Sequence, residues 1–120
     1  MMAYAVSLET FEGPLDLLIN LIQKNKIDIC DIPIANITNQ YLLQIRTWQD
    51  MDMDVTSEFI VMAARLLEIK AKALLPKNEN EQEDSEDLQA RLVRQLVEYK
   101  IFKEISHYFQ TREQVELCAI

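Results

Sequence analysis

The residues that decide the fold are F-E-G-P-L-D-L-L-I at positions 11–19, followed by I-D-I-C-D-I-P-I at positions 27–34. This region holds the only glycine and two of the three prolines of the 120-residue chain, so its backbone is closely specified. Pro14 follows Gly13, and a proline in the first turn of a helix costs nothing because its missing N–H would have no partner there. The sequence therefore predicts that one helix begins at Pro14 and that a second begins at Pro33.

The chain beyond these motifs stays helical in pattern. Apolar residues recur at three- and four-residue steps along the second helix, which is typical of an amphipathic helix. These residues are Ile34, Ile37, Tyr41, Ile45 and Trp48. A third helix is predicted from about Val55 to Leu75, where Pro76 ends it. Since turn residues are scarce, the sequence favours long helices with few connections.

Two further segments complete the predicted fold. Tyr4, Val6 and Leu8 alternate with other residues, which suits a short N-terminal strand with one buried face. Residues 77–84 have too little apolar content to fold and are interpreted as an acidic flexible linker, after which Ser85 caps a fourth helix. We therefore predict a mainly α fold, a small helical bundle with a short N-terminal strand, plus a fourth helix after an acidic linker. The predicted parts are an N-terminal helical domain, the linker and a helical segment, at residues 1–76, 77–84 and 85–120.

The predicted third helix is apolar around most of its circumference. A helix that rests on one neighbour needs an apolar stripe of about 100°, so this one should be buried on two sides. The second side is covered either by the chain's own helices or by another protein, because both arrangements give the same pattern. The linker, likewise, either returns the fourth helix to the bundle or releases it toward a partner.

Composition and charge argue against several functions. A net charge of −8 at pH 7 opposes direct binding to duplex DNA, which depends on basic groups at phosphates. Asp28 and Asp31 lie beside a helix start without a histidine, serine motif or glycine-rich loop, so we interpret them as capping residues rather than a catalytic or metal site. Cys30 and Cys118 lack metal-ligand spacing. We predict no enzyme activity, no metal, no cofactor, no membrane span and no signal peptide, and hence a soluble intracellular protein.

Three long motifs, in order, resemble one family. After the first motif comes Q-Y-L at 40–42, then S-E-F-I-V-M-A-A-R-L-L-E-I-K at 57–70 with L-L-P at 74–76, and finally L-V-E-Y-K at 96–100. These stretches resemble the N-terminal and central region of the segregation and condensation protein A (ScpA) family, the kleisin subunits of bacterial condensin. The resemblance covers essentially the whole chain.

The resemblance implies a function and its partners. In the family, the N-terminal helical domain packs on the coiled-coil neck of an SMC subunit. The region after it is held by a dimer of the accessory segregation and condensation protein B (ScpB). We therefore expect a non-enzymatic subunit that bridges SMC and ScpB in chromosome condensation and segregation, is cytoplasmic and nucleoid-associated, and meets DNA only through the complex.

The resemblance also assigns residues to each contact. The neck contact implied on the third helix comprises Phe59, Met62, Ala63, Leu66, Ile69, Lys70, Ala73 and Leu74. The accessory contact implied on the fourth helix comprises Leu88, Leu92, Leu96, Tyr99 and Phe102. The sequence ends at Ile120 without the family's C-terminal winged helix, so we expect a fragment of a longer kleisin.

A second class of function fits the same residues. The chain could be a self-associating acidic helical adaptor that buries its surplus apolar surface in a homo-oligomer. A flexible linker at 77–84 would also allow two copies to swap their fourth helices. Binding to an SMC neck fragment distinguishes the two hypotheses.

Overall fold

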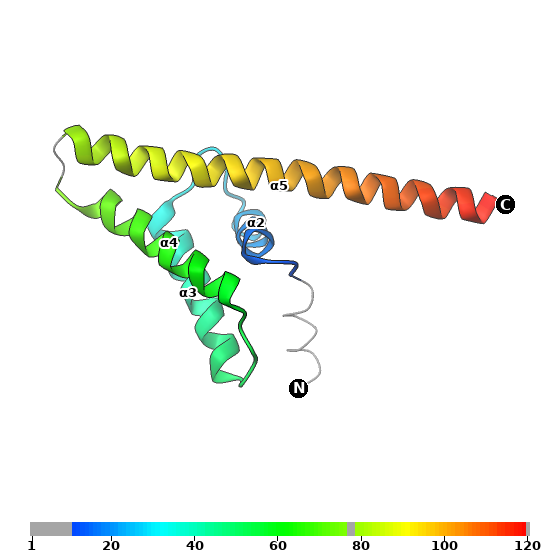
Figure 1. The fold of residues 1–120 in the computed structure, drawn as a ribbon, viewed down its shortest axis with the longest axis horizontal. Helices are drawn as coiled ribbons and strands as arrows, with labels where there is room; N and C mark the ends of the chain where they lie inside the picture. Colours follow the sequence, from blue (N-terminus) through cyan, green and yellow to red (C-terminus); the bar gives the residue numbers. More distant parts are fainter. Residues whose placement is uncertain (1–10, 77–78, 120) are drawn as a thin grey trace.

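The computed structural model describes residues 11–76 and 79–119, which form four α-helices with no strand among them (Figure 1). The helices are α2 (Pro14–Lys24), α3 (Ile34–Asp50), α4 (Ser57–Leu74) and α5 (Glu79–Ala119). The mainly α prediction is confirmed for this part of the chain. The strand predicted around residues 4–8 lies outside the described residues.

The helix ends show how a chain with one glycine makes its turns. Pro14 occupies the first turn of α2, as predicted. At the other end, Lys26 has φ 55°, and the Ile27 N–H donates to the carbonyl oxygen of Ile22 at 3.0 Å. A left-handed residue followed by a hydrogen bond that spans five residues is a Schellman cap. Glycine usually occupies the left-handed position of such a cap.

The end of α3 repeats this arrangement. Asp52 has φ 58°, and the Met53 N–H donates to the carbonyl oxygen of Trp48 at 3.0 Å. Aspartate tolerates the left-handed region better than most residues. The first cap turns the chain from α2 toward α3, and the second turns it from α3 toward α4, which packs against α3.

One hydrophobic core joins all four helices. Each residue of the predicted α3 stripe is buried, including Tyr41, which is fully enclosed. The Tyr41 hydroxyl donates to the carbonyl oxygen of Phe59 at 2.8 Å, and burial raises the pKa of this phenol. Trp48 packs edge-on against Phe59 at 5.7 Å between ring centroids and against Phe11 at 5.9 Å. The motif that begins the described chain is therefore anchored to α3 and α4.

The predicted flexible linker is wrong from Glu79 onward. Helix α5 begins there, six residues before Ser85, and continues without a break to Ala119. Glutamate is a good helix former, and acidic residues are stabilised near a helix N-terminus by the helix dipole. Low apolar content does not prevent a segment from extending a helix that is packed further along.

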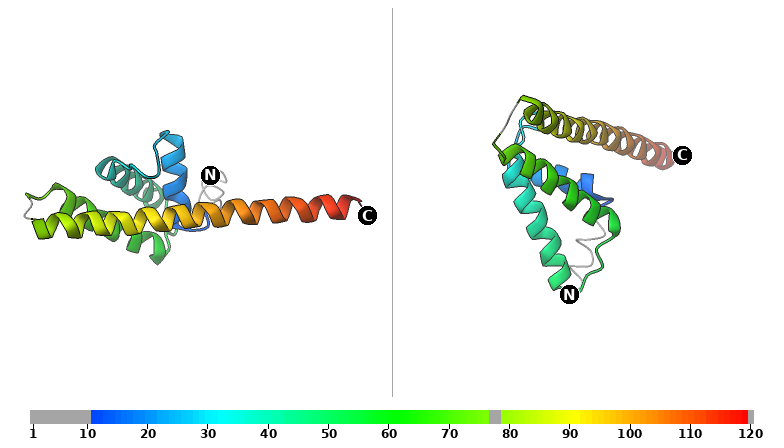
Figure 2. Two further views of the ribbon diagram at one scale, coloured as in Figure 1. Left: turned by 90° about the horizontal axis from the view of Figure 1, so that it is seen from above. Right: turned by 60° about the vertical axis from the view of Figure 1, so that its left-hand side comes forward.

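Helix α5 gives the molecule its elongated shape. At 41 residues it is about 60 Å long, close to the 64 Å of the molecule's longest dimension. Its first half crosses α2 and α4, while its second half extends beyond the other helices (Figures 1 and 2). The chain is thus a helical body with one projecting helix.

Candidate interaction surfaces

Helix α4 lies between α3 and α5 and contacts both. On one side, the Lys70 Nζ donates to the Asn39 Oδ1 of α3 at 2.8 Å. On the other, the Arg65 Nη1 donates to the Gln95 Oε1 of α5 at 2.5 Å. The two buried sides expected from the sequence are therefore covered by the chain's own helices. The fourth helix is packed on the body and not released from it.

This packing changes the predicted neck contact. Five of its eight residues are core residues with at most 9% of their surface exposed, namely Phe59, Met62, Ala63, Leu66 and Ile69. Lys70 and Ala73 are partly buried, and only Leu74 is well exposed, at 66%. In this fold the five core residues are inaccessible to another protein. The sequence pattern marked them as buried, and the structure places the chain's own helices against them.

A different stripe of α4 faces solvent. We call it the α4 seam, and it comprises Ile60, Ala64, Leu67, Ala71 and Leu74, all exposed. Their spacing alternates between four and three residues, which is the repeat of a coiled-coil interface. Sequence reasoning missed this stripe because a helix that is apolar nearly all round hides which stripe is free. Heptad spacing alone does not single it out, because the buried residues Phe59, Met62, Leu66 and Ile69 repeat with the same three- and four-residue steps.

The predicted accessory contact on α5 is divided by the fold. Leu92 and Leu96 are each 1% exposed and belong to the shared core. Leu88 and Tyr99 are partly buried against it, and only Phe102 is well exposed. The residues before Phe102 therefore attach α5 to its own body.

The projecting part of α5 carries its own apolar face. We call it the α5 arm, and its exposed large residues are Ile101, Phe102, Ile105, Tyr108 and Phe109. Spacings of three and four residues put them on one broad side of the helix. An exposed apolar helix face of this length is typical of a protein-interaction surface.

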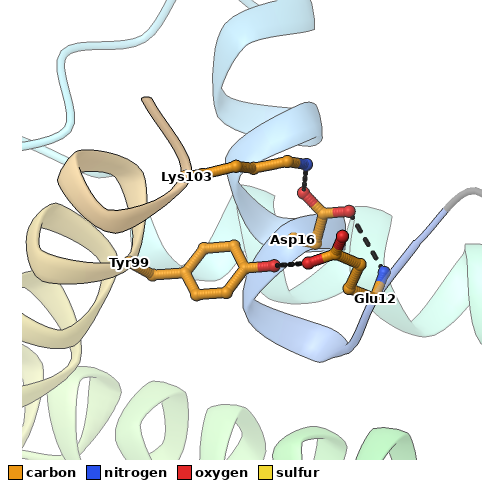
Figure 3. Close-up of polar contacts among 4 residues, drawn as sticks. All are labelled: Glu12, Asp16, Tyr99 and Lys103. Carbon is orange, nitrogen blue, oxygen red and sulfur yellow. Dashed lines mark hydrogen bonds and ion pairs between the residues drawn. The ribbon is translucent and has the colours of Figure 1, made fainter. Parts of the chain in front are cut away.

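Polar contacts fasten α5 to the start of α2 where the arm begins (Figure 3). Asp16 is 4% exposed, and its carboxylate accepts from the Lys103 ammonium and from the Glu12 N–H, the latter at 3.2 Å. The Tyr99 hydroxyl donates to the Glu12 Oε2 at 3.2 Å. We call these four residues the α2–α5 clasp. Because both carboxylates belong to the first motif, its acidic residues are tethered to α5.

The clasp also affects ionisation. Burial raises the pKa of Tyr99 to about 12, and the negative charge of Asp16 and the hydrogen bond to Glu12 add to this. The phenol must keep its proton to donate to the carboxylate. The Tyr99 hydroxyl therefore keeps its proton at neutral pH, and its hydrogen bond to Glu12 is lost only in strong alkali.

The described residues also bear on a metal site and on a membrane span. No group of three or more histidine, cysteine, aspartate or glutamate side chains there could hold a metal ion. Asp28, proposed as a capping residue, accepts from the Cys30 N–H at 3.0 Å through its Oδ1, as a turn residue does. None of the helices over the described ranges is long and apolar enough to cross a membrane.

Comparison with known proteins identifies the family. The family described as segregation and condensation protein ScpA matches residues 21–119. The chain belongs to this family. Segregation and condensation protein A of Caldanaerobacter subterraneus subsp. tengcongensis is 58% identical over 106 residues, which cover 86% of this chain and 43% of that protein. The same-named proteins of Thermoanaerobacter sp. and Bacillus licheniformis are 53% and 47% identical, over 98% and 94% of this chain.

These matches also place the chain within the length of its relatives. It covers 48% of the Thermoanaerobacter protein and 47% of the Bacillus protein. The chain thus spans about half the length of the curated ScpA relatives it matches. The four helices and both exposed apolar surfaces lie within that half.

Proposed function

We propose that this ScpA-family chain is a non-enzymatic subunit of a bacterial condensin, acting in chromosome condensation and segregation. In this role it is cytoplasmic and nucleoid-associated, and it meets DNA only through its partners. Family membership supports the role, and the two exposed apolar surfaces support a binding rather than a catalytic function. With a net charge of −8, the chain is suited to protein partners more than to DNA.

The neck contact is proposed to lie on the α4 seam. Its exposed heptad spacing is the observation that carries the proposal, because such a stripe packs against another helix by inserting side chains between those of its partner. The SMC neck is a coiled coil and offers helices of that kind. This assignment keeps Leu74 from the sequence-based prediction and replaces the core residues with Ile60 and Leu67 and the alanines beside them.

The ScpB contact is proposed to lie on the α5 arm. Phe102 is retained from the predicted set, and the residues of the arm beyond it replace the buried leucines. The arm projects from the body, so a bulky dimer can approach it without meeting α3 or α4 (Figure 1). The two contacts then lie on separate parts of the molecule, one on the helical body and one on the projecting arm.

Reciprocal variants test both assignments. Leu67→Glu is expected to abolish binding to a two-helix SMC head-and-neck fragment and to leave ScpB binding unchanged. Ile105→Glu is expected to do the reverse. Both residues are about half exposed, at 46% and 50%, so neither change places a charge in the core. Binding would be measured by size-exclusion chromatography with light scattering. A Leu67→Glu protein that still binds the neck would refute the seam assignment.

The same measurement addresses the competing hypothesis. A self-associating adaptor would run as a stable dimer that ignores the SMC fragment. The proposed function instead predicts that the free chain is a monomer, or a loose oligomer that the fragment dissociates.

A further inference from the structure

The α4 seam has flanks of opposite charge. Helical residues are 100° apart around the axis, so Glu68 borders the seam on one side and Lys70 on the other. Glu68 is exposed and pairs with Lys72 at 3.2 Å. Lys70 is held by Asn39 on the α3 side of the seam. The seam thus runs between Glu68 on one side and Lys70 on the other, and each of them has a polar partner on the same chain.

The seam also alternates between large and small residues. Ile60, Leu67 and Leu74 project from it, while Ala64 and Ala71 leave room between them. The two alanines are one heptad apart, which is about 10.5 Å along the helix. Facing positions pack best when large residues meet small ones. A partner helix that fits therefore carries two large apolar residues at the same separation.

A second copy of this chain carries large residues at that separation, but its charged flanks do not match. In an antiparallel pair with a twofold axis at Leu67, each flank meets its own equivalent, which brings Glu68 against Glu68 and Lys70 against Lys70. In a parallel pair, flank residues face positions about five residues away, so Lys70 meets Leu75 and Glu68 meets Ala63. Neither arrangement forms an ion pair, and the antiparallel one places like charges together.

We propose that the charged flanks make the α4 seam selective for one orientation of a helix from a different protein. That helix carries an acidic residue facing Lys70, a basic residue facing Glu68, and two large apolar residues that fill the spaces at Ala64 and Ala71. Glu68 and Lys70 are thus specificity residues beside the apolar contact. This inference rests on the proposed SMC contact and adds the chemistry of the helix that the seam accepts.

Charge reversals on the two flanks test the proposal. We expect Glu68→Lys and Lys70→Glu each to weaken binding of the SMC head-and-neck fragment about three- to tenfold at low salt, because each turns an attraction into a repulsion. The loss should shrink in about 1 M salt, where charges separated by more than about 3 Å are screened. Lys70→Gln keeps a donor for Asn39 without the charge, and we expect a smaller loss from it.

Matched reversals on α5 serve as controls. Arg94 and Glu98 are exposed and lie outside both proposed contacts, so Arg94→Glu and Glu98→Lys should bind the fragment within about twofold of the parent chain. Helix content measured by circular dichroism shows that each variant is folded. Flank reversals that match these controls in affinity would overturn the charge selectivity.

The outcomes separate this inference from the proposed function. If Leu67→Glu abolishes binding but both flank reversals are silent at low salt, the seam is the contact and the selectivity is wrong. If the free chain forms a homodimer and Leu67→Glu dissociates it, the seam binds a second copy of this chain. That result would overturn the proposal that it binds a helix from a different protein. Binding that survives Leu67→Glu would refute the proposed function and this inference together.

Discussion

Replacing Leu96 with alanine tests whether α5 belongs to the body. Leu96 is 1% exposed, and alanine is the best helix former, so the change removes core packing without weakening the helix itself. Losing three buried carbons costs about 2.4 kcal/mol at about 0.8 kcal/mol each. The cavity left behind adds to this, and measured Leu→Ala changes at buried sites cost about 3–5 kcal/mol. We expect the free energy of unfolding to fall by about 3 kcal/mol.

The single tryptophan supplies the assay. Trp48 is 2% exposed and packs between Phe11 and Phe59, so its fluorescence reports unfolding of the core rather than fraying of α5. Urea unfolding curves would be compared for the parent chain and the variant. A fall of about 3 kcal/mol is a large part of the stability of a domain this size, so the midpoint should shift visibly.

A matched variant on the same helix provides the control. Ile105 is 50% exposed on the arm, so Ile105→Ala should change the unfolding free energy by less than about 0.5 kcal/mol. If Leu96→Ala had an effect as small as Ile105→Ala, with the urea slope unchanged, α5 would not be packed on the body. The fourth helix would then be released from the body, as the sequence alone allows.

Three other outcomes follow from the clasp and from the start of α5. Lys103→Met should lower the free energy of unfolding by about 1–2 kcal/mol because it leaves the buried Asp16 carboxylate without its cation. Since the lysine is half-exposed, this cost is smaller than at a fully buried pair, and urea curves that overlay the parent's would contradict the prediction. The pKa of Tyr99 is raised from 10 to about 12, so its contribution is complete below pH 10 and is lost as pH rises toward 12; in a pH series of thermal unfolding, Tyr99→Phe should lose less stability over that interval than the parent. Glu83→Pro should shorten α5 at its start, with a slightly smaller helical circular dichroism signal and little change in the free energy of unfolding. Gln95→Pro should instead lower the free energy of unfolding by about 3 kcal/mol or more, and equal effects would mean that the acidic segment also packs on the body.

The helices were predictable because local signals agree with tertiary packing. Pro14 begins α2, Pro76 follows the end of α4, and the α3 stripe from Ile34 to Trp48 is buried as its spacing predicts. Each of these positions is governed by backbone geometry or by one amphipathic face. Such signals depend on neighbours within about four residues and can be read from a single sequence.

The surfaces were less predictable because burial depends on distant segments. Leu66 and Leu67 are adjacent and chemically identical, yet one is fully buried and the other is 46% exposed. Only the positions of α3 and α5 decide between them. The same holds for α5, where Leu96 attaches the helix and Phe102 is free. Family resemblance pointed to α4 and α5, but it could not say which side of each helix is buried against the rest of the chain.

The unbroken course of α5 has a mechanical consequence. Because α5 is held by the clasp at Lys103 and continues without a break to Ala119, the helical body sets the direction in which the arm projects. Adding one residue just after Lys103 would turn the apolar residues beyond it, Ile105, Tyr108 and Phe109, by about 100° around the helix axis, whereas adding seven would nearly restore their direction and move them about 10.5 Å outward. The number of residues in α5 therefore sets the angle and the distance between a protein bound to the arm and one bound to the α4 seam.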